Sequence, residues 1–157
     1  VAPGVRIGAG TVINPWCWIE TDVAIGGNCK IGPFAKIRAG TTIGNMTEIG
    51  SFVEVNRSSV GKRVCAKHLA YLGDAVVGDD VNIGAGAVTA NFDGKNKHVT
   101  KVGNGVLIGS NTVLVAPVSV PPRVKTGAGA VVTRKTRMKK GDVVVGVPAR
   151  PVSQKRG

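Results

Sequence analysis

Branched aliphatic residues recur at every sixth position through the first third of the chain. The series runs Ile7, Ile13, Ile19, Ile25, Ile31, Ile37, Ile43, Ile49 and Val55. Four residues after each of these stands a small residue, in the series Thr11, Cys17, Val23, Cys29, Ala35, Thr41, Thr47, Val53 and Ser59. Two series that share one frame indicate a single structural unit of six residues, repeated many times.

This repeat predicts an all-β fold, a triangular parallel β-solenoid. Each unit forms one flat side, and three sides make a coil of about eighteen residues. The aliphatic residue fills the centre of the tube, and glycine allows the tight turn between sides. The chain is rich in valine, isoleucine and alanine and has only 4% aromatic residues, which agrees with β-structure around a narrow interior.

The frame is interrupted in two ways. Val60-Gly61 arrives one residue early, so we expect His68 to lie where the lattice slips and a side chain can leave it. After Thr89 the frame is lost until Val102, which predicts a loop extruded from the solenoid around 90–101.

We expect one β-helix domain over residues 1–145 and a basic C-terminal tail over 146–157. The net charge is +12, and the stretch from Pro121 to Gly157 contains ten basic residues and one acidic residue. Such a field attracts polyanions, which include nucleic acid, an anionic cofactor or a phosphorylated substrate. The basic stretch contains no aromatic residue that could stack on bases, so no nucleic-acid partner is expected.

Cysteine and histidine usage limits the other classes of site. Cys17, Cys29 and Cys65 follow no disulfide or metal-binding spacing, and the two histidines are thirty residues apart. The sequence shows neither a secretory signal nor an apolar run long enough to cross a bilayer. We therefore expect buried structural thiols, a cytoplasmic location, no metal and no membrane partner.

Several motifs together resemble a known family. They are "GPFAKIRAG" (32–40), "HLAYLGDA" (68–75), "NIGAG" (82–86), "NFDGKNK" (91–97), "IGSNT" (108–112) and "LVAPV" (114–118). The repeat resembles the left-handed β-helix of hexapeptide-repeat acyltransferases. The motifs, over about residues 25 to 134, resemble the acetyltransferase domain of the bifunctional glucosamine-1-phosphate N-acetyltransferase / N-acetylglucosamine-1-phosphate uridyltransferase family.

The resemblance implies a left-handed solenoid, acetyl-CoA as co-substrate and a homotrimer with sites between subunits. It also implies a place in UDP-N-acetylglucosamine biosynthesis and cell wall biogenesis. The sequence contains no uridyltransferase half, which leaves a stand-alone relative, a split enzyme and an excised domain all open.

N-acetylation needs a base, because an amine at neutral pH is mostly protonated. Histidine suits this task, and the resemblance implies that His68 is the general base and that Glu54 holds its tautomer. From the residues alone, a lattice-breaking histidine satisfied by a backbone carbonyl remains open.

Other roles are also implied by the resemblance. The substrate-binding residues would be Arg38, Asn56, Tyr71, Asn82 and Lys97. The residues that bind acetyl-CoA would be Ala85, Asn91, Phe92, Ser110, Ala128 and Arg150. Simple packing of Tyr71 and a solvated Lys97 are the alternatives.

One position departs from the family pattern, because Asn56 stands where a substrate-binding lysine is expected. Either Arg57 replaces the lost charge or the acceptor differs. The leading hypothesis is an acetyl-CoA-dependent N-acetyltransferase that converts glucosamine 1-phosphate into N-acetylglucosamine 1-phosphate. The alternatives are another acceptor, such as galactosamine 1-phosphate or a nucleotide-linked amino sugar, and a non-catalytic solenoid that binds polyanions.

Overall fold

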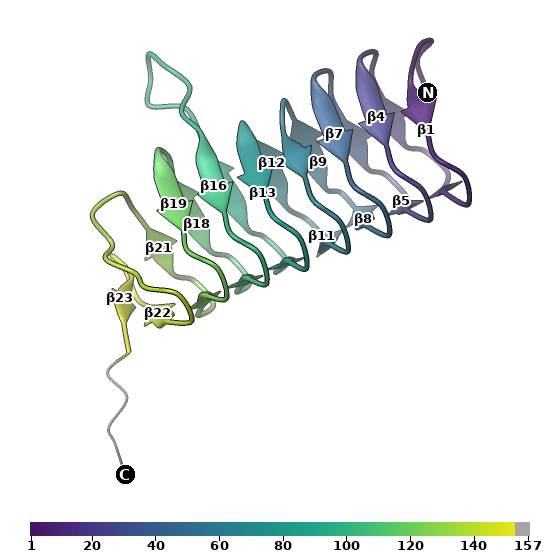
Figure 1. Cartoon of the computed structure of the whole chain (residues 1–157). Helices are drawn as coiled ribbons and strands as arrows, with labels where there is room; N and C mark the ends of the chain where they lie inside the picture. The colour runs from purple at the N-terminus through teal and green to yellow at the C-terminus, as the bar shows by residue number, and fades with distance from the viewer. Residues whose placement is uncertain (153–157) are drawn as a thin grey trace.

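The computed structural model, which describes residues 1–152, is a straight prism of stacked coils (Figure 1). Strands β1 to β21 form seven coils of three strands, and each coil gives one strand to each of three sheets. Pairing between successive coils is parallel, and only β22 and β23 pair antiparallel. This is the parallel β-helix of left-handed type that the sequence predicts.

The three sheets are named A, B and C in the order in which the chain visits them. Sheet A contains β1 (Arg6–Ile7), β4 (Val23–Ile25), β7 (Thr41–Ile43), β10 (Ser59–Val60), β13 (Ala75–Val77), β16 (Thr100–Val102) and β19 (Val118–Val120). Sheet B contains β2 (Val12–Ile13), β5 (Lys30–Ile31), β8 (Glu48–Ser51), β11 (Cys65–His68), β14 (Asn82–Ile83), β17 (Leu107–Ile108), β20 (Lys125–Thr126), β22 (Val143–Val145) and β23 (Arg150–Pro151). Sheet C contains β3 (Trp18–Ile19), β6 (Lys36–Ile37), β9 (Glu54–Asn56), β12 (Tyr71–Gly73), β15 (Val88–Ala90), β18 (Val113–Val115) and β21 (Val131–Val132).

The core is a ladder of aliphatic side chains along the prism axis. Ile31, Ile37 and Ile49 are completely buried, as the six-residue repeat predicts. Ile7 is in register with the buried Ile25, as the repeat predicts, but its side chain is 41% exposed. The reason is that β1 pairs with a single neighbour, β4, so the side chain is covered from one side only.

The two slips in the frame lie at the edge between sheets C and A. Val55 and Val60 are five residues apart instead of six, and so are Leu72 and Val77. His68 is not at a slip, because it lies in regular register opposite Ser51. The expectation about its lattice position is therefore wrong.

The shortened corners are tight turns whose central residues adopt left-handed backbone conformations. Arg57 and Asp74 have φ values of 47° and 48°. The turns at Arg57 and Asp74 let the chain pass from sheet C to sheet A with one residue fewer than usual. Each of them shifts the six-residue frame by one position in all later coils.

Aromatic side chains stack outside the prism, at the edge between sheets B and C. The rings of Trp16 and Phe34 are 4.9 Å apart, and those of Phe34 and Phe52 are 5.1 Å apart. Phe52 is 60% exposed. In the run from Phe52 to Val55, only the two valines, Val53 and Val55, are buried.

The regular coils are interrupted at residues 91–99, between β15 and β16, where a loop leaves the prism (Figure 1). This is the predicted extruded loop. After β21 the chain crosses to β22 without adding a strand to sheet A, and Met138 packs against the core. Part of the predicted tail, β23, pairs with β22, while residues 153–157 of that tail lie outside the described residues.

The cysteines only partly match expectation. All three are free thiols, but Cys29 alone is buried, whereas Cys17, which packs against the core in the first coil, and Cys65 are half-buried. Residues 1–152 contain no helix that is long and apolar enough to cross a membrane. The same residues contain no cluster of three potential metal ligands.

Ile31→Ala should destabilise the protein by about 2–5 kcal/mol, because it removes a fully buried side chain and leaves a cavity that the stacked coils cannot close. The measurement is the free energy of unfolding in urea. Lys30→Ala, on the exposed side of the same strand, is the control and should change stability by less than about 0.5 kcal/mol. Equal losses would contradict this view of the core.

Candidate functional site

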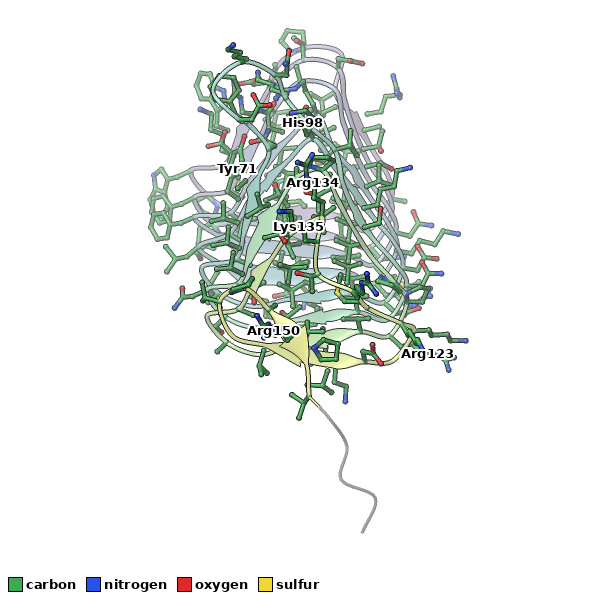
Figure 2. The ribbon with its side chains drawn as sticks, turned by 90° about the vertical axis from the view of Figure 1, so that its left-hand side faces the viewer. Tyr71, His98, Arg123, Arg134, Lys135 and Arg150 are labelled. Atoms are coloured by element: carbon green, nitrogen blue, oxygen red, sulfur yellow. The ribbon has the colours of Figure 1, made fainter. Side chains whose placement is uncertain are left out.

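Most of the candidate residues lie on the face of sheet C or along its two edges. We call the edge between sheets B and C the BC edge, the edge between C and A the CA edge, and the remaining edge the AB edge. Figure 2 looks along the prism, with His98 near the CA edge, Arg123 at the AB edge and Tyr71 on the side formed by sheet C.

On the BC edge, His68 begins a column of predicted acetyl-CoA residues. Its Cα pairs with Ser51 in the preceding coil. In the following coils, the Asn111 N–H donates to the Ala85 carbonyl at 2.8 Å, and the Gly129 N–H donates to the Ser110 carbonyl at 2.8 Å. Ala85, Ser110 and Ala128 therefore occupy equivalent positions in successive coils.

The coils approach closely along this edge. A Cβ added to Gly84 would lie 2.5 Å from the Ser110 nitrogen, so only glycine fits there. The His68 side chain is exposed, and within residues 1–152 it has no hydrogen-bond partner. The column thus presents a free imidazole beside a strip of backbone and small side chains.

On the face of sheet C, Glu54 contacts an arginine rather than the histidine. Arg38 Nη1 donates to Glu54 Oε1 at 3.2 Å, and Arg38 Nε lies 3.7 Å from Glu20 Oε1. The Nε atom is buried and forms no hydrogen bond to the described residues. Tyr71 lies opposite Glu54 in the next coil and is half-buried. The role of Glu54 in orienting His68 stays a prediction.

At the CA edge, Asp74 holds two side chains at once. Arg57 donates to it through two nitrogens, Nε to Oδ1 at 2.7 Å and Nη2 to Oδ2 at 2.8 Å. Asn91 donates its Nδ2 hydrogen to the same carboxylate, and Arg57 Nη1 also donates to Asn56 Oδ1 at 3.2 Å. A bidentate arginine–carboxylate pair is among the stronger hydrogen-bonded pairs in proteins.

The Asp74 carboxylate is kept ionised by these partners. The hydrogen bonds from Arg57 lower its pKa, partial burial opposes this, and the hydrogen bond from Asn91 lowers the pKa further. Asp74 also holds the far end of the extruded loop, because its carbonyl accepts the Thr100 N–H at 3.1 Å. The Arg57 charge, which sequence offered as a replacement for lysine at 56, is therefore already paired.

Sequence reasoning did not assign Asp74, although it lies within the motif "HLAYLGDA". A signal existed: both five-residue steps of the frame contain one member of the Arg57–Asp74 pair. The two residues are seventeen apart, which places them one coil apart at the same corner.

The extruded loop is closed by Asp93. Its carboxylate accepts the backbone N–H groups of Lys95 and Asn96 at 2.8 and 2.7 Å, and its Oδ2 lies 2.6 Å from His98 Nε2. The hydrogen bond from Asn96, and then that from His98, hold the pKa of Asp93 well below its usual range.

The predicted residues Phe92 and Lys97 face each other across this loop. They form a β-bridge, and both are exposed. Two other predicted residues lie elsewhere. Asn82 is exposed on sheet B, opposite Cys65, and Arg150 is exposed in β23 at the C-terminal end.

One chain therefore does not bring all the predicted residues together. Six positions separate His68 from Asp74 along one side of the prism, and at most about 3.3 Å per residue this is roughly 20 Å. The BC edge holds His68 and the column, and the CA edge holds Asn91, Phe92 and Lys97. Each group is internally ordered, but they occupy opposite edges of sheet C.

Asp74→Asn should lower the urea midpoint of unfolding at pH 7. In this variant the midpoint should also fall less steeply than in the wild type as the pH is lowered. Because the pKa of folded Asp74 is lowered, the unfolded chain takes up this proton at a higher pH than the folded chain. The carboxylate therefore stabilises the fold above the unfolded pKa of aspartate, about 3.9. That stabilisation is lost as the pH falls through the folded pKa.

The matched control is Asp80→Asn, which removes the pair between Arg63 Nε and Asp80 Oδ1, 2.6 Å apart on the exposed AB edge. An exposed pair contributes little, so this variant should differ little from the wild type. Equal acid profiles for the wild type and Asp74→Asn would contradict the prediction.

Comparisons with known proteins agree with the repeat and its motifs. Residues 22–57 match the family model "Bacterial transferase hexapeptide (six repeats)", and residues 99–134 match "Hexapeptide repeat of succinyl-transferase". The bifunctional protein GlmU of Heliobacterium modesticaldum is 54% identical over 81 residues, which is 52% of this chain and 18% of the relative. GlmU of Neisseria meningitidis serogroup C is 53% identical over the same length and shares.

A solved structure shows the same fold. A single-residue mutant of AntD, an N-acyltransferase from Bacillus cereus crystallised with dTDP and coenzyme A, has a TM-score of 0.53 at 19% identity and covers 96% of this chain and 84% of its own. The chain spans less than a fifth of the GlmU relatives that it matches. Over about half of its length the chain is thus similar to the bifunctional protein GlmU, and two stretches of it match hexapeptide-repeat models.

Proposed function

We propose that the chain is an acetyl-CoA-dependent N-acetyltransferase that acts on an amino-sugar 1-phosphate, with glucosamine 1-phosphate as the leading acceptor. The observation that carries the proposal is the column on the BC edge. The exposed imidazole of His68 lies in line with the half-buried Ala85 and with the exposed Ser110 and Ala128. Such a column suits an extended thioester arm that lies along the prism.

The proposed reaction needs one proton transfer and one acyl transfer. His68 takes a proton from the amino group of the sugar, and the nitrogen attacks the thioester carbonyl carbon. The new N–C bond forms, the C–S bond breaks, and coenzyme A leaves and takes up a proton as the free thiol. A backbone N–H of the turn at Ala85 is the expected donor to the carbonyl oxygen during attack.

Arg38 and Tyr71 are the proposed acceptor contacts on sheet C. The buried Nε of Arg38 lacks an acceptor among the described residues, and a phosphate oxygen would supply one. Asn56 adds no charge, and Arg57 is already held by Asp74. We therefore expect the site to bind the phosphate group more weakly than it would with a lysine at position 56. For this reason galactosamine 1-phosphate and nucleotide-linked amino sugars should be tested as acceptors as well.

A homotrimer with sites between subunits is part of the proposal. The outward side chains of the C-terminal half of sheet C are apolar, in the series Val88, Val113, Val115 and Val131. On sheet A, the corresponding positions are Val76, Lys101 and Ser119, so that two of the three are polar. If three copies pack these faces around a threefold axis, the BC edge of each copy meets the CA edge of the next. Each contact then joins the two halves of a site.

The proposed reaction also implies a cytoplasmic location, where acetyl-CoA is available, and a place in the supply of N-acetylglucosamine for UDP-N-acetylglucosamine.

The test of the reaction is thiol release from acetyl-CoA in the presence of glucosamine 1-phosphate. His68→Ala should reduce kcat by at least about 100-fold, because general-base catalysis typically contributes 10²–10⁴-fold. Lys67→Ala, the exposed neighbour on the same strand, is the control and should stay close to wild type. A silent wild-type protein with every acceptor in the panel would refute the proposed function.

Val113→Glu should break the assembly, because it places a carboxylate on the apolar part of sheet C. Sedimentation should show smaller species, acetyl transfer should fall with them, and the β-sheet signal in circular dichroism should persist. Ser119→Glu makes the same change on the exposed face of sheet A and should leave the oligomer intact. Unchanged sedimentation of Val113→Glu would exclude this face as the contact.

A further inference from the structure

The extruded loop, residues 91–99, has no apolar core of its own. Residues 92 to 97 are all exposed, and the ring of Phe92 is 59% exposed. Burial of apolar surface therefore contributes little to the order of this part of the chain. The loop carries two of the predicted site residues, Phe92 and Lys97, so other contacts have to fix its conformation.

The base of the loop is fixed to the prism at Asp74. Asn91 donates its Nδ2 hydrogen to the Asp74 carboxylate, and the Asp74 carbonyl accepts the Thr100 N–H at 3.1 Å. The two sides of the loop are joined where the His98 N–H donates to the Asn91 carbonyl at 2.7 Å. These contacts hold both ends of the loop, whereas its tip lies beyond them.

The tip of the loop is held by one carboxylate. Asp93 Oδ1 accepts the N–H groups of Lys95 and Asn96 at 2.8 and 2.7 Å, and Asp93 Oδ2 lies 2.6 Å from His98 Nε2. The Asp93 N–H in turn donates to the Asn96 carbonyl at 3.1 Å. Gly94 completes the reversal with a φ of 97°, which suits glycine. We call the contacts of Asp93 with Lys95, Asn96 and His98 the Asp93 clamp.

His98 connects the tip of the loop to its base. Its backbone N–H bonds to Asn91 at the base, and its ring bonds to Asp93 at the tip. Because an ionised carboxylate only accepts hydrogen bonds, Nε2 has to carry the hydrogen. The side chain is 31% exposed and borders a cavity of about 500 Å³ that Arg134 and Lys135 also line (Figure 2). The exposed tip is thus tied to the prism through this histidine.

The Asp93 clamp also determines where Lys97 lies. Phe92 and Lys97 form an antiparallel β-bridge on either side of the turn that Asp93 closes. Lys97 lies near enough to Asp74 for its charge to contribute to the lowered pKa of that carboxyl. The side chain of Lys97 is therefore close to the corner of the prism, although its backbone belongs to the exposed tip.

We propose that Asp93 and His98 are positioning residues for acetyl transfer, which hold the tip of the loop so that Phe92 and Lys97 are in place before the substrates bind. The inference rests on the proposed function and on the predicted contacts of Lys97 with the acceptor and of Phe92 with acetyl-CoA. Asp93 and His98 themselves touch neither substrate. They reduce the conformational entropy that the loop loses on binding, so they act on substrate binding more than on the chemical step.

The first test measures the order of the loop in the absence of substrates. Trypsin cleaves after lysine, and both Lys95 and Lys97 lie at the tip. Cleavage within the loop, located by mass spectrometry, should be at least about 10-fold faster in Asp93→Ala than in the wild type, because three hydrogen bonds to a charged group are lost. His98→Ala, which loses one of them, should be intermediate. His98→Gln should resemble the wild type, because its amide can still donate to the carboxylate.

The matched control is Asp79→Ala. The Asp79 carboxylate also accepts a backbone N–H, that of Lys62 at 2.8 Å, but it lies on the AB edge. This variant should leave cleavage in the loop unchanged. The loop variants should keep the urea midpoint of the wild type, because the loop lies outside the buried core. A wild-type rate of loop cleavage in Asp93→Ala would overturn the Asp93 clamp.

The second test separates positioning from a purely structural role by steady-state kinetics. In Asp93→Ala, the KM values for glucosamine 1-phosphate and acetyl-CoA should rise by a larger factor than kcat falls, because the lost order affects the ground state and the transition state alike. His98→Gln should restore the KM values that His98→Ala raises. Faster loop cleavage with unchanged KM values would overturn the positioning role.

A third measurement distinguishes this inference from the proposed reaction. Titration calorimetry with coenzyme A, without any acceptor, should show a higher Kd for Asp93→Ala than for the wild type and for Asp79→Ala. Equal Kd values for all three proteins would count against the positioning of Phe92. A wild type that binds coenzyme A but transfers no acetyl group would count against the proposed reaction and not against the Asp93 clamp.

Discussion

Parallel hydrogen bonding between coils is the constraint on which the rest of the structure depends. From β1 to β21, strands pair with the equivalent strands of the neighbouring coils. Equivalent positions are therefore stacked at a spacing of about 4.8 Å. The buried isoleucines, the exposed aromatic stack and the column that starts at His68 are all products of this stacking. The position of a residue within its coil therefore determines its spatial neighbours more than the adjacent residues in sequence do.

The core and the loop could be predicted from sequence because both follow from periodicity. An aliphatic residue every six positions, as at Ile31, Ile37 and Ile49, leaves little choice about which side chains point inward. Loss of the period after Thr89 marks residues that cannot continue the prism. The site motifs were recognisable as well, but only through resemblance, since the repeat alone is common to many proteins.

The details of the corners could not be predicted in the same way. A step of five residues shows that one residue is missing, but it does not say at which corner the chain shortens. The structure places both short corners at the CA edge, where Arg57 and Asp74 have left-handed backbone and bind each other. Pairing across a corner depends on this geometry, so neither the role of Asp74 nor the pairing of Glu54 with Arg38 was visible in the sequence.

The paired arginines limit where an anion can bind. Arg57 is held by Asp74, and Arg38 is near both Glu20 and Glu54. An incoming phosphate therefore has to compete with carboxylates on sheet C, whereas Arg134 and Lys135 have no such competitors among the described residues. The positive charge of the chain is therefore unevenly available to an anion, because some of its arginines are paired with carboxylates and others are not.

Stacking also makes distance along the prism countable in whole coils. Val102 and Val120 occupy the same position in adjacent coils of sheet A, so the eighteen residues 103–120 form one removable unit. Without that unit the core would remain continuous, but the cavity at Arg134 would move one strand spacing closer to His68. Gain or loss of a coil would therefore change the distance between two features of the prism in discrete steps of one strand spacing.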